Sequence, residues 1–150
     1  MIISDETVIF TSADFPDYFV DKHHPDDFRP VKESFTDLIY HERTGHNRII
    51  LRITVKMGEE YYVPFTFVCD TGAPNTIYLN EVTRRIIKSR ILKDDLKNEY
   101  MRVGPRKFTV LSTPPPHDDS NVIGIRALFA FGLVMRQDET FEFTNLPEYL

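Results

Sequence analysis

Residues 61–79 read Tyr-Tyr-Val-Pro-Phe-Thr-Phe-Val-Cys-Asp-Thr-Gly-Ala-Pro-Asn-Thr-Ile-Tyr-Leu. An apolar, β-rich run up to Cys69 leads into the triplet Asp70-Thr71-Gly72, where the pattern breaks at a glycine. A second apolar run, Asn121-Val122-Ile123-Gly124, also ends in a glycine and predicts a short buried strand. The chain therefore contains two buried strands that each lead directly into a glycine-containing loop.

The residues before this run predict the first half of a β-hairpin. From Arg48 to Met57 the chain is typical of a half-buried strand, with Ile49, Leu51, Ile53, Val55 and Met57 on one face. Gly58-Glu59-Glu60 predicts the turn, and Tyr61 to Cys69 predicts the returning strand. The hairpin brings the chain directly to Asp70.

The second half of the chain predicts two helices and further strands. Asn80 stands at the N-cap position of a helical stretch, Glu81 to Tyr100, whose apolar face comprises Val82, Ile86, Ile87, Ile91 and Leu96. Its charged side, including Lys88, Arg90, Lys93 and Lys97, is expected to face solvent. Strands are expected at Met101 to Leu111, around a Gly104-Pro105 turn, and at Glu139 to Phe143, with a short apolar helix at Ile125 to Phe131.

Residues 1–47 are interpreted as an N-terminal arm and residues 48–150 as the main domain. The arm mixes aromatic, proline and acidic residues without a period of 2 or 3.6, and it predicts short strands or a turn of helix around Val31 to Tyr40. The run His23-His24-Pro25-Asp26-Asp27 does not have the spacing of a known metal-ligand set, and neither does His41 with His46. We therefore expect solvated loops and no metal at these histidines.

The composition is that of one globular domain. The chain has 150 residues, of which 41% are hydrophobic, and its formal net charge is −5. This acidity argues against nucleic acid as the main partner, although the basic residues Arg84, Arg85, Lys88 and Arg90 are close together in the sequence. No stretch approaches the roughly 20 apolar residues of a membrane helix, and no secretory signal is evident, so we expect a cytoplasmic protein without a membrane partner. The single cysteine, Cys69, is predicted to be a small buried hydrophobe.

Together, the two strand-to-loop units resemble those of the retropepsins, the retroviral-type aspartic proteases. In that family an acid-Thr/Ser-Gly-Ala loop is followed two residues later by Thr and an aliphatic pair, and here Asp70-Thr71-Gly72-Ala73 precedes Thr76-Ile77. The family's second unit, two aliphatic residues and a glycine before a short helix, is similar to Val122-Ile123-Gly124. The resemblance spans Ile49 to Phe143. It implies an all-β fold with one or two short helices, arranged as a retropepsin-like small acid-protease barrel.

The resemblance also implies an aspartic endopeptidase that cleaves peptide or protein substrates without a metal or organic cofactor. Such enzymes hold a water between two carboxyl groups that share one proton. Asp70 would be the catalytic residue, Thr71 and Gly72 would support the catalytic loop, and Gly72 with Ala73 would bind the substrate. Since the chain has a single Asp-Thr-Gly, the second carboxyl group requires a second copy, which implies a homodimer with a shared site. By resemblance, the terminal strand at Glu139 to Phe143 would interleave across the dimer.

Two features depart from the family pattern. Retropepsins cover the substrate with a glycine-rich hairpin flap, whereas the stretch between Leu79 and Met101 has no glycine and is predicted to be helical, so the flap is expected to be reduced or replaced. After Ala73, Pro74 stands where retroviral members commonly carry an acidic residue, and the matching arginine is displaced by one position to Arg126. These changes indicate a different set of dimer contacts.

Three alternatives to an active protease remain open. The first is an inert retropepsin-fold module for dimerisation or peptide binding, which needs the same fold. The second is a folded segment of a larger polyprotein that uses the aromatic arm, Thr11 to Tyr40, as a docking strand. The third is a simple strand-to-turn loop, in which Asp70 accepts backbone hydrogen bonds and Gly72 adopts a positive φ.

Overall fold

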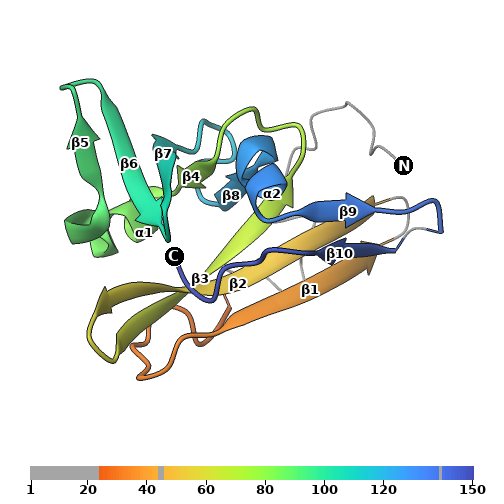
Figure 1. Cartoon of the computed structure of the whole chain (residues 1–150), viewed down its shortest axis with the longest axis horizontal. Coiled ribbons are helices and arrows are strands. Elements are labelled where there is room, and N and C mark those ends of the chain that lie inside the picture. Colours follow the sequence, from red (N-terminus) through yellow and green to blue (C-terminus); the bar gives the residue numbers. More distant parts are fainter. Residues whose placement is uncertain (1–23, 44–45, 139) are drawn as a thin grey trace.

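A computed structural model of the chain describes residues 24–43, 46–138 and 140–150. These residues form a mostly β protein with an eight-stranded sheet, a two-stranded sheet and two short α-helices, which confirms the all-β class (Figure 1). The strands are β1 (Thr36–Arg43), β2 (His46–Gly58), β3 (Tyr61–Asp70), β4 (Ile77–Leu79), β5 (Leu92–Asp94), β6 (Asn98–Val103), β7 (Arg106–Ser112), β8 (Asn121–Gly124), β9 (Leu133–Met135) and β10 (Phe141–Phe143). The large sheet has the order β1-β2-β3-β8-β4-β7-β6-β5. The helices are α1 (Glu81–Ile86) and α2 (Ile125–Ala130), and a 3₁₀ turn, η2, spans Lys88–Arg90.

The predicted hairpin is formed by β2 and β3, which pair antiparallel from Ile49 opposite Cys69 to Gly58 opposite Tyr61. The predicted apolar face of β2 lies in the core, with Ile49, Leu51, Ile53 and Val55 buried and Met57 packed against them. The prediction of a half-buried strand is wrong, because Ile50 and Thr54 on the opposite face are fully buried as well. Both faces of β2 are therefore covered.

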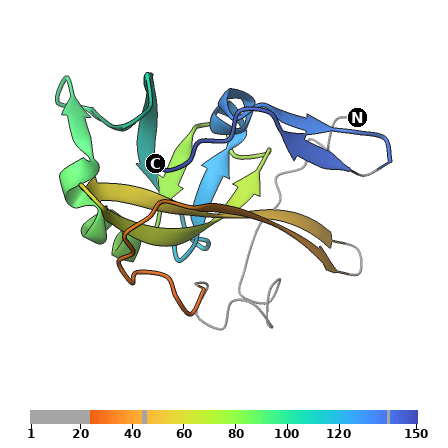
Figure 2. The same cartoon turned by 60° about the horizontal axis from the view of Figure 1, so that its bottom comes forward.

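The segment before β1 covers the second face of the hairpin, opposite α2 (Figure 2). The Asp27 side chain is fully enclosed there. Its Oδ1 accepts a hydrogen bond from Arg52 Nε at 2.8 Å, and its Oδ2 accepts one from Thr66 Oγ1 at 2.6 Å. The Arg52 guanidinium also lies 4.9 Å from the ring centroid of Phe35. Because buried charges need such partners, this network fixes the arm on the sheet.

The arm joins the main sheet directly. β1 pairs antiparallel with β2, from Thr36 opposite Ile53 to Arg43 opposite His46. The prediction of a short strand near 31–40 is thus confirmed by β1, and no helical turn forms among the described residues of this segment. The remaining arm residues, 1–23, lie outside the described part of the chain.

The helix predicted from Glu81 to Tyr100 is wrong beyond its first turns. Asn80 caps α1 as predicted, since its Oδ1 accepts the Thr83 N–H at 2.7 Å, but α1 ends at Ile86. After η2 the chain forms an antiparallel hairpin, β5–β6, whose turn residues Asp95 and Leu96 have φ of 52° and 70°. The hairpin forms because β6 pairs with β7. The backbone hydrogen bonds between these two strands stabilise the hairpin more than the helical spacing of the apolar residues stabilises a helix.

The C-terminal elements follow the prediction more closely. β8 leads directly into α2, and β10 confirms the last predicted strand over residues 141–143, while Glu139 lies outside the described residues. β10 pairs with β9 of the same chain. Leu150 then runs along β2, donating to the Thr54 carbonyl at 2.8 Å and accepting from the Lys56 N–H at 2.9 Å. Figures 1 and 2 place β9–β10 and β5–β6 at opposite ends of the molecule, with α2 between them.

Candidate active site

Asp70 is the last residue of β3, and its carboxylate is tied to the loop that it begins. Oδ1 accepts the Gly72 N–H at 2.8 Å, and the Asp70 carbonyl accepts the Ala73 N–H at 3.1 Å. The residue is only 6% exposed. A charge-assisted bond to a backbone N–H fixes the orientation of the carboxylate, as a catalytic group requires.

The loop after Asp70 is bonded to the beginning of α2. β3 and β8 are parallel, and Asp70 is the register partner of Gly124. Three backbone hydrogen bonds connect the loop to this junction: Gly124 N–H to Thr76 O at 2.8 Å, Ile125 N–H to Ala73 O at 2.8 Å and Arg126 N–H to Asn75 O at 3.3 Å. The two glycine-containing units predicted from the sequence therefore form one bonded structure.

Gly124 is required at this junction by close approach. A Cβ atom on this residue would lie 2.1 Å from the Asn75 carbonyl oxygen and 2.9 Å from that of Ala73. Both neighbours are backbone atoms, so no side-chain rotation can make room. Only glycine allows the loop and α2 to meet at this distance.

Two side chains next to Asp70 stay neutral at neutral pH. Burial raises the pKa of the Cys69 thiol, and the negative charge of Asp70 raises it further. Desolvation likewise raises the pKa of Tyr78, with a smaller contribution from Asp70, while a hydrogen bond from the Asn75 N–H at 2.9 Å opposes this rise. Cys69 is buried in the core, as predicted from the sequence.

Tyr78 and Asn75 were not among the residues predicted for the site. Their contact forms because the loop bends back, so that the backbone of Asn75 meets the hydroxyl of a residue in β4. In the sequence, the pair is marked only by an asparagine three residues before a tyrosine. This spacing is also common outside such loops, so it does not predict the contact. Tyr78 braces the loop that carries Asp70.

The other predicted loop residues, Thr71, Gly72 and Ala73, are half-buried beside Asp70. Gly72 donates its N–H to Asp70, and Ala73 uses both its N–H and its carbonyl within the protomer. In the described part of the protomer, by contrast, the Thr71 hydroxyl has no hydrogen-bond partner. The Thr71 hydroxyl is thus one of the polar groups that this loop leaves unused within the described residues.

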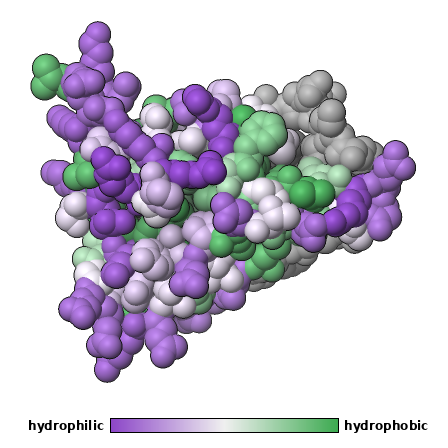
Figure 3. All heavy atoms as spheres, in the orientation of Figure 1, coloured by the Kyte–Doolittle hydropathy of each residue, from purple (hydrophilic) through white to green (hydrophobic). Residues whose placement is uncertain are grey.

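An apolar surface lies next to the loop. Phe129, on α2 one turn after the bonded junction, is 75% exposed, and Val134 on β9 is 38% exposed. Apolar residues gather over α2 and the beginning of β9, whereas hydrophilic residues dominate the end that carries β5–β6 (Figure 3). Exposed apolar side chains that lie together in one patch are typical of a contact surface.

Of the histidines considered for a metal site, the structure describes the side chain of His24, while those of His23, His41 and His46 lie outside the described part of the chain. His24 Nδ1 accepts the Asp26 N–H at 3.1 Å, and Asp27 is engaged by Arg52 and Thr66. Across the described residues, no group of three or more His, Cys, Asp or Glu side chains is arranged to hold a metal ion. Asp27 thus serves to attach the arm to the sheet.

Comparisons with models of known protein families, with curated proteins and with solved structures give no match. Among the described residues, no helix has both the length and the apolar character needed to cross a membrane. The function is therefore inferred from the geometry of the Asp70 loop.

Proposed function

We propose that the protein is a retropepsin-like aspartic endopeptidase that acts as a homodimer. The observation that carries this proposal is the pairing of Asp70 with Gly124, together with the three backbone bonds that join the loop to α2. A simple turn after β3 needs no glycine contact from a strand more than fifty residues further along the chain. The order of hairpin, Asp-Thr-Gly loop, further strands, second glycine unit and helix also agrees with the resemblance found in the sequence.

In the proposed mechanism, two copies of the Asp70 loop meet across a two-fold axis. Two carboxyl groups at about 3 Å share one proton, so one carboxylate accepts a proton from the water while the protonated group polarises the substrate carbonyl. The Gly72 N–H holds each carboxylate in place. The Thr71 hydroxyl, unused within its own protomer, would donate to the loop of the second copy.

The proposed dimer interface includes the loop and α2. Because residues 124–126 are bonded to the loop, a second copy that covers Phe129 is brought close to Asp70. Burying a large aromatic side chain contributes roughly 1.5–3 kcal/mol per copy, which favours association. β9–β10 would add a hairpin to the same interface, in place of a single interleaved terminal strand.

The β5–β6 hairpin is the candidate cover for the substrate. It follows β4 and α1 in the chain, in the region where the family carries its flap, and Leu96 at its tip is 95% exposed. Asp95 and Leu96 supply the left-handed turn without a glycine. An apolar tip that closes over a bound peptide would exclude water from the two carboxyl groups.

A second candidate is a module of the same fold that dimerises or binds peptides without cleaving them. It is favoured by the shortness of β5, which has three residues, and by Ala73, whose backbone N–H and carbonyl are both used inside the protomer. A short hairpin, together with a loop whose backbone groups are already hydrogen-bonded, leaves a substrate peptide fewer groups to bind. The two candidates differ in activity and agree in oligomeric state.

The test compares wild type with Asp70→Asn and with Asp118→Asn, a matched change at an exposed loop residue. Each full-length protein is incubated with denatured casein at mildly acidic pH, and its mass is measured by light scattering. The proposal expects a dimer in all three proteins, cleavage by wild type and Asp118→Asn, and none by Asp70→Asn. Full activity of Asp70→Asn or a monomeric wild type would overturn it, and an inactive dimeric wild type would establish the module.

A further inference from the structure

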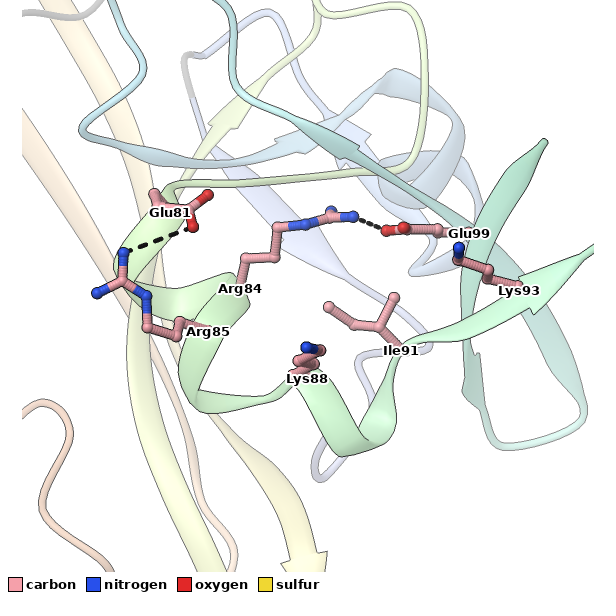
Figure 4. A pocket seen from close by; sticks show the side chains of 7 residues that line it. All are labelled: Glu81, Arg84, Arg85, Lys88, Ile91, Lys93 and Glu99. Atoms are coloured by element: carbon pink, nitrogen blue, oxygen red, sulfur yellow. Dashed lines mark ion pairs between the residues drawn. The ribbon is translucent and has the colours of Figure 1, made fainter. Parts of the chain in front are cut away.

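A basic pocket lies between the helical segment α1–η2 and the β5–β6 hairpin, apart from the Asp70 loop (Figure 4). Its volume is about 400 Å³, within the range of small-molecule sites. It is lined by four cationic side chains, two carboxylates and one aliphatic residue: Arg84, Arg85, Lys88, Lys93, Glu81, Glu99 and Ile91. The lining therefore carries a net charge of +2 on a protein whose overall charge is −5.

The two carboxylates of this pocket are already neutralised. Glu99 forms an ion pair with Arg84, which reaches across the pocket from α1 (Figure 4). Glu81 pairs with Arg85 one helical turn away, at 3.6 Å. Neither carboxylate is left to balance the two lysines.

Lys88 and Lys93 are the surplus charges. They extend from opposite walls, Lys88 from η2 and Lys93 from β5, and neither forms an ion pair within the described residues (Figure 4). No further carboxylate lines the pocket to balance these two ammonium groups. An anion held between the two walls would balance them.

We propose that this pocket binds a small phosphate-containing anion of at least two negative charges, of the diphosphate class. Lysine ammonium groups bind phosphate oxygens as point charges, and the Arg84 and Arg85 guanidinium groups offer further N–H donors. Ile91 provides an apolar contact between the charged walls. Because the ligand would contact both α1–η2 and β5–β6, it would also hold the hairpin at a fixed angle to the helical segment.

Isothermal titration of the full chain with inorganic pyrophosphate tests the proposal, at about 20 mM salt so that charge screening is weak. We expect saturable one-site binding. Lys88→Gln/Lys93→Gln should bind at least about tenfold more weakly, since it loses both unpaired ammonium groups. The control Lys32→Gln/Lys97→Gln has the same net charge and alters two exposed lysines outside the pocket, so its affinity should change by less than about twofold.

A third variant tests the sign of the effect. Glu99→Gln keeps the shape of the side chain, removes one negative charge and releases Arg84, so it should tighten pyrophosphate binding by about threefold or more. The proposal is overturned if wild type does not bind pyrophosphate, if the two lysine double variants lose affinity equally, or if Glu99→Gln binds more weakly. Tighter binding of a hexaglutamate peptide than of pyrophosphate would also overturn it, because the site would then favour an acidic polypeptide.

Discussion

Replacing Gly124 with alanine probes the contact that joins the Asp70 loop to α2. The new Cβ would lie 2.1 Å and 2.8 Å from the carbonyl oxygen and carbon of Asn75, and 2.9 Å from the carbonyl oxygen of Ala73. Ordinary van der Waals contact begins at 3.4 Å, so the loop and helix would have to separate by more than 1 Å. Gly124→Ala is therefore expected to disrupt this junction.

The magnitude follows from the hydrogen bonds that such a separation breaks. The three bonds from residues 124–126 to the loop have lengths of 2.8, 2.8 and 3.3 Å, and none survives an added ångström. At about 1 kcal/mol each, their loss destabilises the fold by about 3 kcal/mol. Keeping the bonds instead would leave the overpacked contact, which costs a similar amount, about 1–3 kcal/mol or more.

The assay is urea unfolding followed by far-ultraviolet circular dichroism, because the chain has no tryptophan. All proteins are compared at one protomer concentration, since a dimer's stability depends on it. Gly104→Ala is the matched control: its φ is +60°, but no atom lies within 4 Å of the new Cβ, so only backbone strain of about 1 kcal/mol is expected. A loss of stability in Gly124→Ala no larger than that in Gly104→Ala would show that the close contact at Gly124 does not hold the loop to α2.

Two further predictions concern the ion pair of the arm and the thiol beside Asp70. Asp27→Ala should destabilise the protein by about 3–5 kcal/mol, because it leaves Arg52 buried without its carboxylate. Asp26→Ala, at an exposed neighbour, should change stability by less than about 0.5 kcal/mol in the same urea titration, and equal losses would contradict the assignment. The pKa of Cys69 is raised in the folded state above its ordinary value of 9.0, so above that pH the unfolded chain holds fewer protons and stability falls as pH rises. Cys69→Ala should therefore flatten the decline in urea midpoint above about pH 9, while an unchanged slope would show that the thiol does not contribute.

The parts of the fold that the sequence predicted are those with a local pattern. β2, β3, β8 and α2 each carry their own period or glycine boundary, and the structure has them at nearly the predicted residues. The second buried face of β2 was missed because Arg52 looks solvent-facing in a strand pattern. Its partner, Asp27, lies 25 residues earlier in the chain, and no local rule connects the two.

The helix predicted beyond Ile86 shows a second limit of local patterns. Ile87 is fully buried, as a helix face predicts, but Val82 is 48% exposed and Leu96 lies at the hairpin tip. The spacing of apolar residues does not say whether a neighbouring strand can pair with the segment. Here β7 pairs with β6, so the segment forms a strand. For the candidate site, the Asp-Thr-Gly triplet predicts Asp70, whereas the hydrogen bond between Tyr78 and the loop depends on how the loop folds back and has no signature in the sequence.

The exposed surface and the unused hydroxyl both bear on why the proposed site needs a second copy. The loop is rigidly bonded to the beginning of α2, so Thr71 and Phe129 belong to one structural unit. A monomer would leave Phe129 75% exposed and the Thr71 hydroxyl without a partner in the described protomer. A second copy placed on α2 would bury Phe129 and lie near the Thr71 hydroxyl. It would also supply the other carboxyl group. In the proposed dimer, oligomeric state and catalytic competence are linked through one surface, so a substitution at Phe129 should reduce cleavage only at protein concentrations at which it dissociates the dimer.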